Sequence, residues 1–211
     1  MIFNLLDQPA LLIIVPLAIV IVIAVHEFSH ALVAFWLGDQ TAAQQGRLTL
    51  NPLAHLDPAG TIMLLVVGFG WGKPVPFNPY NLKYQKWGPT MIALAGPVSN
   101  FIWAIIFALV FKFSLGWLEP ESLALQFLLY LIFFNVILGI FNLIPIPPLD
   151  GSKALFAILP LKYEKLAFWL QRNGSFLLIG LLLFLYLSDS NFFQNLVGQL
   201  VDLIFRLIGV V

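Results

Sequence analysis

Long apolar runs separated by short polar segments dominate the pattern of this chain. Three of them are long enough to cross a bilayer as helices, since about 20 apolar residues span its hydrocarbon core. They cover about residues 11–37, 89–111 and 124–143. Two apolar stretches near the C-terminus, residues 175–187 and 192–210, predict one or two further helices. The pattern therefore predicts an α-helical integral membrane protein with a core of three transmembrane helices.

The segment between the first two predicted spans has a different pattern. Residues 46–50 alternate polar with apolar, which favours a short strand and a loop on the bilayer surface about equally. Residues 61–69 are apolar but too few to span, so they predict a re-entrant or buried piece. Together they predict a short membrane-associated β/re-entrant region over residues 46–70. Residues 71–79 contain three prolines and should be extended.

Composition supports a membrane protein and excludes several function classes. Of 211 residues, 61% are hydrophobic and 9% charged, and the mean hydropathy is +0.96, beyond the range of soluble domains. We expect one domain over residues 1–211, with a core at about 10–155 and a C-terminal helical region at about 160–211. The formal net charge of zero offers no basic face for nucleic acid. Because cysteine is absent, disulfides and thiolate ligands are excluded.

The chemistry is concentrated in one pentapeptide within the first apolar run, His26-Glu27-Phe28-Ser29-His30. Residues four apart lie on one face of an α-helix, so both histidines can bind one metal ion. Glu27 then lies beside the ion without binding it, where it can accept a proton from a bound water. Ionisable side chains inside a membrane are costly and usually functional, which strengthens this interpretation.

Two later spans carry amides and small residues on one face. The span from residue 89 has a four-residue spacing that allows close helix approach, formed by Gly96, Asn100, Ala104 and Ala108. On the next span Asn135, Gly139 and Asn142 share a face that should point inward. A packing hydrogen bond is the more common role for an amide such as Asn100.

A third metal ligand is expected after the last of these spans. Residues 142–151 contain three prolines and cannot continue the helix. Asp150 is their one acid, and Gly151 lets the backbone turn sharply beside it. An Asp-Gly pair is usually a turn, but zinc hydrolases commonly take a third protein ligand, and Asp150 is the best candidate.

The distribution of Lys and Arg predicts the orientation in the membrane. Positive charge gathers at residues 73–86 and 153–172, whereas the loop between the second and third spans contains Glu119 and Glu121. The positive-inside rule then makes the two positively charged segments cytoplasmic and the N-terminus external. The motif and Asp150 both fall toward the cytoplasmic side.

Three motifs resemble the signatures of the site-2 protease family of intramembrane zinc metalloproteases: HEFSH at 26–30, AGPVSN at 95–100 and NLIPIPPLDG at 142–151. GRLTLNPLAHLDPAG at 46–60 and WGKPVPFNP at 71–79 further resemble its small prokaryotic subgroup, which has no PDZ or nucleotide-sensing module. The resemblance implies that His26, His30 and Asp150 bind one Zn²⁺ and that Glu27 activates the zinc-bound water. It also implies hydrolysis of peptide bonds in or near transmembrane segments of membrane-protein substrates, in a prokaryotic plasma (inner) membrane.

Further roles are expected for residues outside the metal-ligand set. Asn142, and with it Asn100, could help to bind substrate or stabilise an oxyanion. Leu48 and Thr49 could pair with an unwound substrate by β-augmentation. His55 could act as a lid or inhibitory ligand, but the turn chemistry of Asp57-Pro58 favours a surface loop. A polar stripe on the C-terminal helix would suit an interfacial helix or a homo-oligomer.

A transporter or channel that moves zinc or protons through intramembrane His and acidic residues is the alternative. It needs a polar path to both faces, whereas the polar residues here gather toward one leaflet. A third hypothesis is an inactive homologue that acts as a scaffold. The intact set of His, Glu, His and Asp argues against it.

Overall fold

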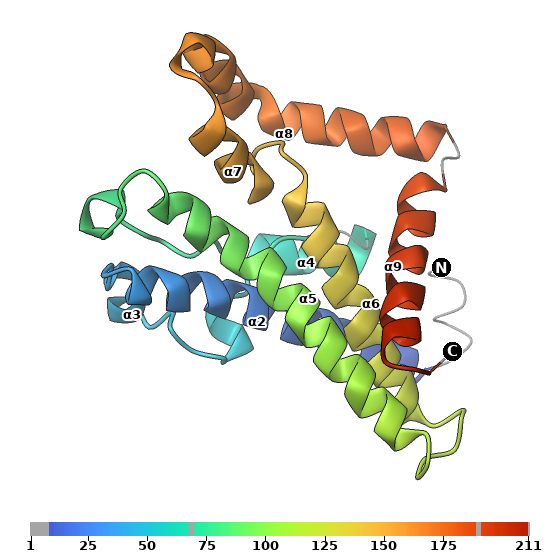
Figure 1. Ribbon diagram of the computed structural model, residues 1–211. Helices are drawn as coiled ribbons and strands as arrows, with labels where there is room; N and C mark the ends of the chain where they lie inside the picture. Colours follow the sequence, from blue (N-terminus) through green and yellow to red (C-terminus); the bar gives the residue numbers. More distant parts are fainter. Residues whose placement is uncertain (1–8, 68–69, 189–190, 211) are drawn as a thin grey trace.

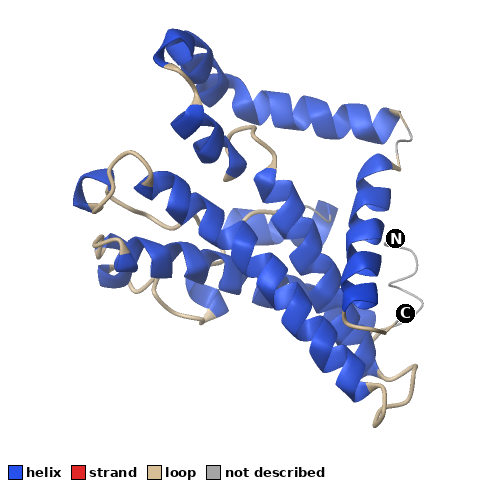
Figure 2. Cartoon of the chain, viewed as in Figure 1, coloured by secondary structure: helices blue, strands red, loops and turns tan. Residues whose placement is uncertain are grey.

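The computed structural model describes residues 9–67, 70–188 and 191–210, and across these ranges the chain is helical (Figure 2). Four helices are long and apolar enough to span a membrane: α2 (Leu11–Trp36), α5 (Gly88–Ser114), α6 (Leu123–Leu143) and most of α8 (Glu164–Leu187). The prediction of a helical integral membrane protein is confirmed, and the first three spans fall within three residues of their predicted bounds.

Helices α2, α5 and α6 pack side by side and form the body of the molecule (Figure 1). On α5 the predicted stripe of Gly96, Asn100, Ala104 and Ala108 is buried throughout. Small side chains there allow α2 and α6 to approach α5 closely. Asn135 and Gly139 of α6 are buried as well, and Asn142 at the end of that face is half-buried.

The predicted strand at residues 46–50 is wrong. Gly46 belongs to a turn, and Leu48 and Thr49 form a bend. The described residues contain one isolated antiparallel bridge, which joins Leu56 to Gly72. The short helix α3 (Thr41–Gln44) ends just before this segment, and residues 46–70 instead contain the 3₁₀ turn η1 (Pro52–Ala54) and the ten-residue helix α4 (Pro58–Val67). Within the predicted re-entrant piece, residues 68 and 69 lie outside the described ranges.

Buried polar side chains fix these connecting segments. Asp39, fully buried just after α2, accepts hydrogen bonds from the backbone N–H groups of Thr41 and Asn78 and from the Asn81 side chain, beside the 3₁₀ turn η2 (Pro79–Asn81). Arg47 is also buried and donates to the carbonyls of Lys73 and Pro74. Residues 46–50 are thereby tied to the proline-rich segment 71–79.

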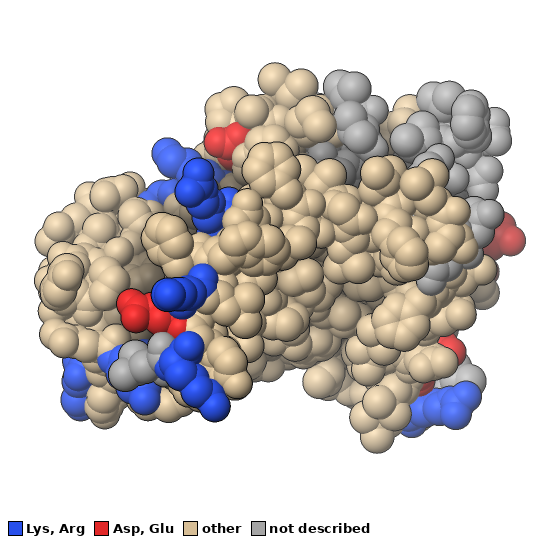
Figure 3. All heavy atoms as spheres, turned by 90° about the horizontal axis from the view of Figure 1, so that it is seen from above, with Lys and Arg blue, Asp and Glu red and all other residues tan. Residues whose placement is uncertain are grey.

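The C-terminal part begins with α7 (Gly151–Ile158), followed by the 3₁₀ turn η3 (Leu161–Tyr163). Helix α8 then extends away from the body, and α9 (Phe192–Leu207) returns alongside α6 (Figure 1). Val197 of α9 packs against Ala104 and Val136. Charged side chains gather toward the ends of the face in Figure 3 and leave an uncharged middle, as a membrane-embedded surface requires.

Candidate metal centre

Helix α2 holds His26 and His30 one turn apart, as the sequence predicts. Their Nε2 atoms lie 3.0 Å apart, with the two rings nearly perpendicular. Both side chains are buried. The i,i+4 spacing thus directs one nitrogen of each ring to a common point.

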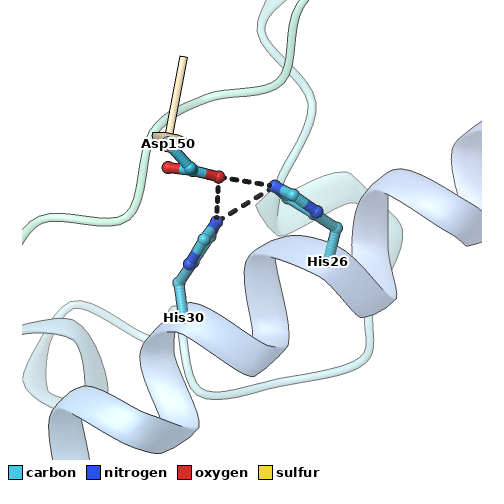
Figure 4. A group of neighbouring side chains, drawn as sticks. All are labelled: His26, His30 and Asp150. Carbon is cyan, nitrogen blue, oxygen red and sulfur yellow. Dashed lines mark hydrogen bonds and ion pairs between the residues drawn. The ribbon is translucent and has the colours of Figure 1, made fainter. Parts of the chain in front are cut away.

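The carboxylate of Asp150 faces the two imidazole rings of α2 (Figure 4). Its Oδ2 lies 3.2 Å from Nε2 of His26 and 3.1 Å from Nε2 of His30. The segment between α6 and α7 brings it there, and a side chain at Gly151 would collide with the Leu143 carbonyl at the end of α6. Glycine is needed at residue 151 because the chain folds back so tightly on itself.

The outward-facing atoms of the three side chains are also held. Nδ1 of His26 lies 2.7 Å from the Oδ1 atom of Asn100, and Nδ1 of His30 lies 2.7 Å from the Ile92 carbonyl. Asp150 Oδ1 accepts a hydrogen bond of 3.3 Å from Lys153 Nζ. Such outer contacts are typical of metal ligands, whose rings and carboxylates need fixed orientations.

These contacts leave three electron-rich atoms facing one another. Because a carbonyl only accepts, His30 Nδ1 carries a proton, and in the neutral ring Nε2 then has a free lone pair. Two imidazole nitrogens and a carboxylate oxygen so close together repel one another unless a cation lies between them, so the residues present fit a metal ion.

Glu27 follows His26 on α2 and is half-buried. A side-chain carbon built at Gly72 would lie only 3.3 Å from Glu27 Oε1, so the backbone around the Leu56–Gly72 bridge lies directly against this carboxylate. The loop region therefore packs next to the centre.

The other predicted site residues lie elsewhere. Asn142 donates to the Leu138 carbonyl one turn earlier in α6. Leu48 and Thr49 belong to the bend and form no strand edge. His55 is fully buried, so the predicted surface loop is wrong; its ring lies 2.7 Å from the Thr49 carbonyl, and burial lowers its pKa. His55 is not part of the group formed by His26, His30 and Asp150.

Comparison with known proteins shows the family to which the chain belongs. The chain is 44% identical over 149 residues to "Putative zinc metalloprotease YwhC" of Bacillus subtilis, with 68% of each chain covered. Residues 118–185 match the family model described as "Peptidase family M50". The chain belongs to peptidase family M50. The resemblance to site-2 proteases is therefore confirmed.

Other M50 relatives are longer than the matched region. The chain is 31% identical over 140 residues to "Putative zinc metalloprotease Rip2" of Mycolicibacterium smegmatis, and it spans about half of that protein, 52%. It is 38% identical over 81 residues to "Zinc metalloprotease MJ0392" of Methanocaldococcus jannaschii. No solved structure gives a significant match to this M50 chain.

Sequence reasoning did not predict that several residues contact the centre. The Ile92 carbonyl and the Lys153 ammonium carry no motif signal of their own. Gly96 was predicted to allow helix approach, but a side-chain carbon there would lie 2.5 Å from His26 Cε1 and 2.6 Å from His30 Nε2. The sequence signal that could have revealed this contact is the position of Gly96 in AGPVSN, four residues before Asn100.

Proposed function

We propose that this chain is an intramembrane zinc metalloprotease that hydrolyses peptide bonds in or near transmembrane segments of membrane proteins. The observation that carries the proposal is the convergence of the three ligand-type atoms of His26, His30 and Asp150 within 3.2 Å of one another. Its relatives named as zinc metalloproteases support zinc as the metal.

In this proposal His26 Nε2, His30 Nε2 and Asp150 Oδ2 hold the ion. When bound, zinc supplies Lewis-acid chemistry, which polarises a substrate carbonyl and makes a water molecule more acidic. Glu27 accepts the proton of the attacking water on a carboxylate oxygen and delivers it to the amide nitrogen as the C–N bond breaks. Asn142, half-buried at the end of α6, is proposed to orient the substrate.

Metal removal tests this function. We expect purified protein to contain about one zinc per chain and to cleave a single-pass membrane substrate until a strong zinc chelator is added. Added Zn²⁺ should restore cleavage. Elemental analysis should show much less zinc in the Asp150→Ala variant. Cleavage that persists after complete removal of zinc would rule out the proposal.

A transporter has less support, because it needs a polar path to both faces of the membrane, which must continue beyond the group of His26, His30 and Asp150. In the described residues the polar contacts behind it end at a backbone carbonyl within α6. A transport function predicts zinc flux into sealed vesicles containing the protein, which the protease proposal does not.

We further propose that the protein lies in a prokaryotic plasma membrane with its N-terminus outside and the metal centre toward the cytoplasm. The Lys-rich segment before α5 and the acidic loop between α5 and α6 support this orientation. Since the chain has no cysteine, single Lys83→Cys and Glu119→Cys variants are clean probes. An impermeant thiol reagent outside intact cells should label only Glu119→Cys, and the reverse pattern would contradict the orientation.

A further inference from the structure

A row of buried amides extends behind His26 and away from the candidate metal centre. His26 Nδ1 lies 2.7 Å from Asn100 Oδ1, and Asn100 Nδ2 donates to Asn135 Oδ1 at 2.9 Å. Asn135 Nδ2 in turn donates to the Leu131 carbonyl at 2.8 Å. The two asparagines are almost completely buried, at 0% and 1% exposure. The row links α2, α5 and α6 and ends at the backbone of α6.

The Leu131 carbonyl at the end of this row determines the donor and acceptor orientation of both amides. The Leu131 carbonyl can only accept, so Asn135 must point its NH₂ group toward it and its oxygen toward Asn100. Asn100 must then point its own NH₂ group toward Asn135 and its oxygen toward His26. Turning both amides around would bring the Asn135 oxygen against the Leu131 carbonyl oxygen. The row therefore requires a proton on His26 Nδ1 and leaves Nε2 free to bind a metal.

His30 reaches the same state without a relay, because its Nδ1 bonds directly to the Ile92 carbonyl. Asn100 alone offers His26 no such guarantee, since an amide can present either its oxygen or its NH₂ group. A neighbour that fixes the orientation of this amide ensures that Asn100 presents its oxygen to His26.

We propose that Asn135 is a positioning residue for the metal centre: it fixes the orientation of the Asn100 amide and, through Asn100, the metal-binding form of His26. This inference rests on the proposed function, because it takes His26 Nε2 as a zinc ligand. The competing explanation is that Asn135 only joins α5 to α6, as interhelical amides in membranes often do. The two explanations make different predictions once the identity of residue 100 is changed.

The test compares Asn135→Leu in two backgrounds of the full-length chain, with zinc affinity measured by competition against a chelator of known affinity. In the wild-type background we expect about tenfold weaker zinc binding, at the lower end of the usual loss for outer contacts of metal ligands. In the Asn100→Asp background we expect no further loss from Asn135→Leu. A carboxylate presents an acceptor to His26 however it is turned, so nothing remains for Asn135 to orient.

The matched control is Asn173→Leu on α8. Asn173 also donates to the backbone carbonyl four residues earlier, that of Trp169, but it has no part in the row. Its replacement should leave zinc affinity unchanged. Thermal unfolding of each zinc-free variant reports any loss of packing separately from the loss of zinc affinity.

Wild-type affinity in Asn135→Leu overturns the inference, and so does an equal loss of affinity in both backgrounds, since a packing role acts in either one. If Asn135→Leu does not fold, Asn135→Ala replaces it in the same two backgrounds, because it adds no new atoms to the interface. A wild-type chain that binds no zinc overturns the proposed function and the inference together. A zinc-binding wild type with an unaffected Asn135 variant overturns the inference alone.

Discussion

Glu27→Gln should retain its zinc and lose about 10²–10⁴-fold in cleavage rate, the usual contribution of a general base. Glutamine matches glutamate in size but cannot accept a proton, so the variant separates metal binding from chemistry. Because Glu27 is not one of the three clustered side chains, the contacts among them should remain intact. Single-turnover cleavage of a reconstituted membrane substrate and elemental analysis of the same sample measure both quantities.

Glu164→Gln is a suitable control for this change. It makes the same substitution at an exposed acid at the start of α8, outside the candidate centre. Its zinc content and cleavage rate should equal those of the wild type. Cleavage by Glu27→Gln within a few-fold of the wild-type rate would exclude the proposed role of Glu27.

The sequence was most informative where local rules determine the structure. The i,i+4 spacing of His26 and His30 directs both rings to one point on any regular helix. The prolines after residue 142 force α6 to end, which lets Asp150 fold back toward α2. Apolar runs of sufficient length located the first three spans. Each of these features depends on residues close together in the chain.

The loop region was predicted less well because tertiary contacts decide its structure. The alternation at residues 46–50 imitates a strand, but Gly46 has φ of 69° in the left-handed region, where a strand cannot begin. Arg47 is drawn into the interior by the carbonyls of Lys73 and Pro74, which lie far along the chain. Neither carbonyl can be recognised from residue types, since every residue carries one.

The error at His55 has a more local cause. Asp57-Pro58 was interpreted as turn chemistry, which favoured a surface loop around His55. In the structure Asp57 accepts a hydrogen bond of 2.8 Å from the Gly60 N–H, and Pro58 is the first residue of α4. An acceptor side chain followed by proline is also the signal for a helix start. The neighbouring histidine is covered as the chain enters this helix.

Gly96→Ala is expected to weaken zinc binding by about 10- to 100-fold, although the change adds one carbon and no charge. That carbon would lie 2.5–2.6 Å from atoms of both imidazoles, closer than such contacts allow. Overpacking of this kind costs about 1–3 kcal/mol, and about 1.4 kcal/mol corresponds to a tenfold change in affinity. Chelator competition measures the loss, and the cleavage rate at limiting zinc should fall with it.

Other glycines in the spans provide graded controls for this effect. A carbon added at Gly180 on α8 meets nothing within 4 Å, so Gly180→Ala should leave zinc affinity unchanged. A carbon at Gly139 would press on the Phe101 ring at 2.9 Å. Gly139→Ala should therefore lower the unfolding temperature while zinc affinity stays close to that of the wild type. If Gly96→Ala binds zinc as tightly as Gly180→Ala, the imidazoles have room to move apart, and the close packing of α5 on the His26–His30 pair does not set the geometry of the centre.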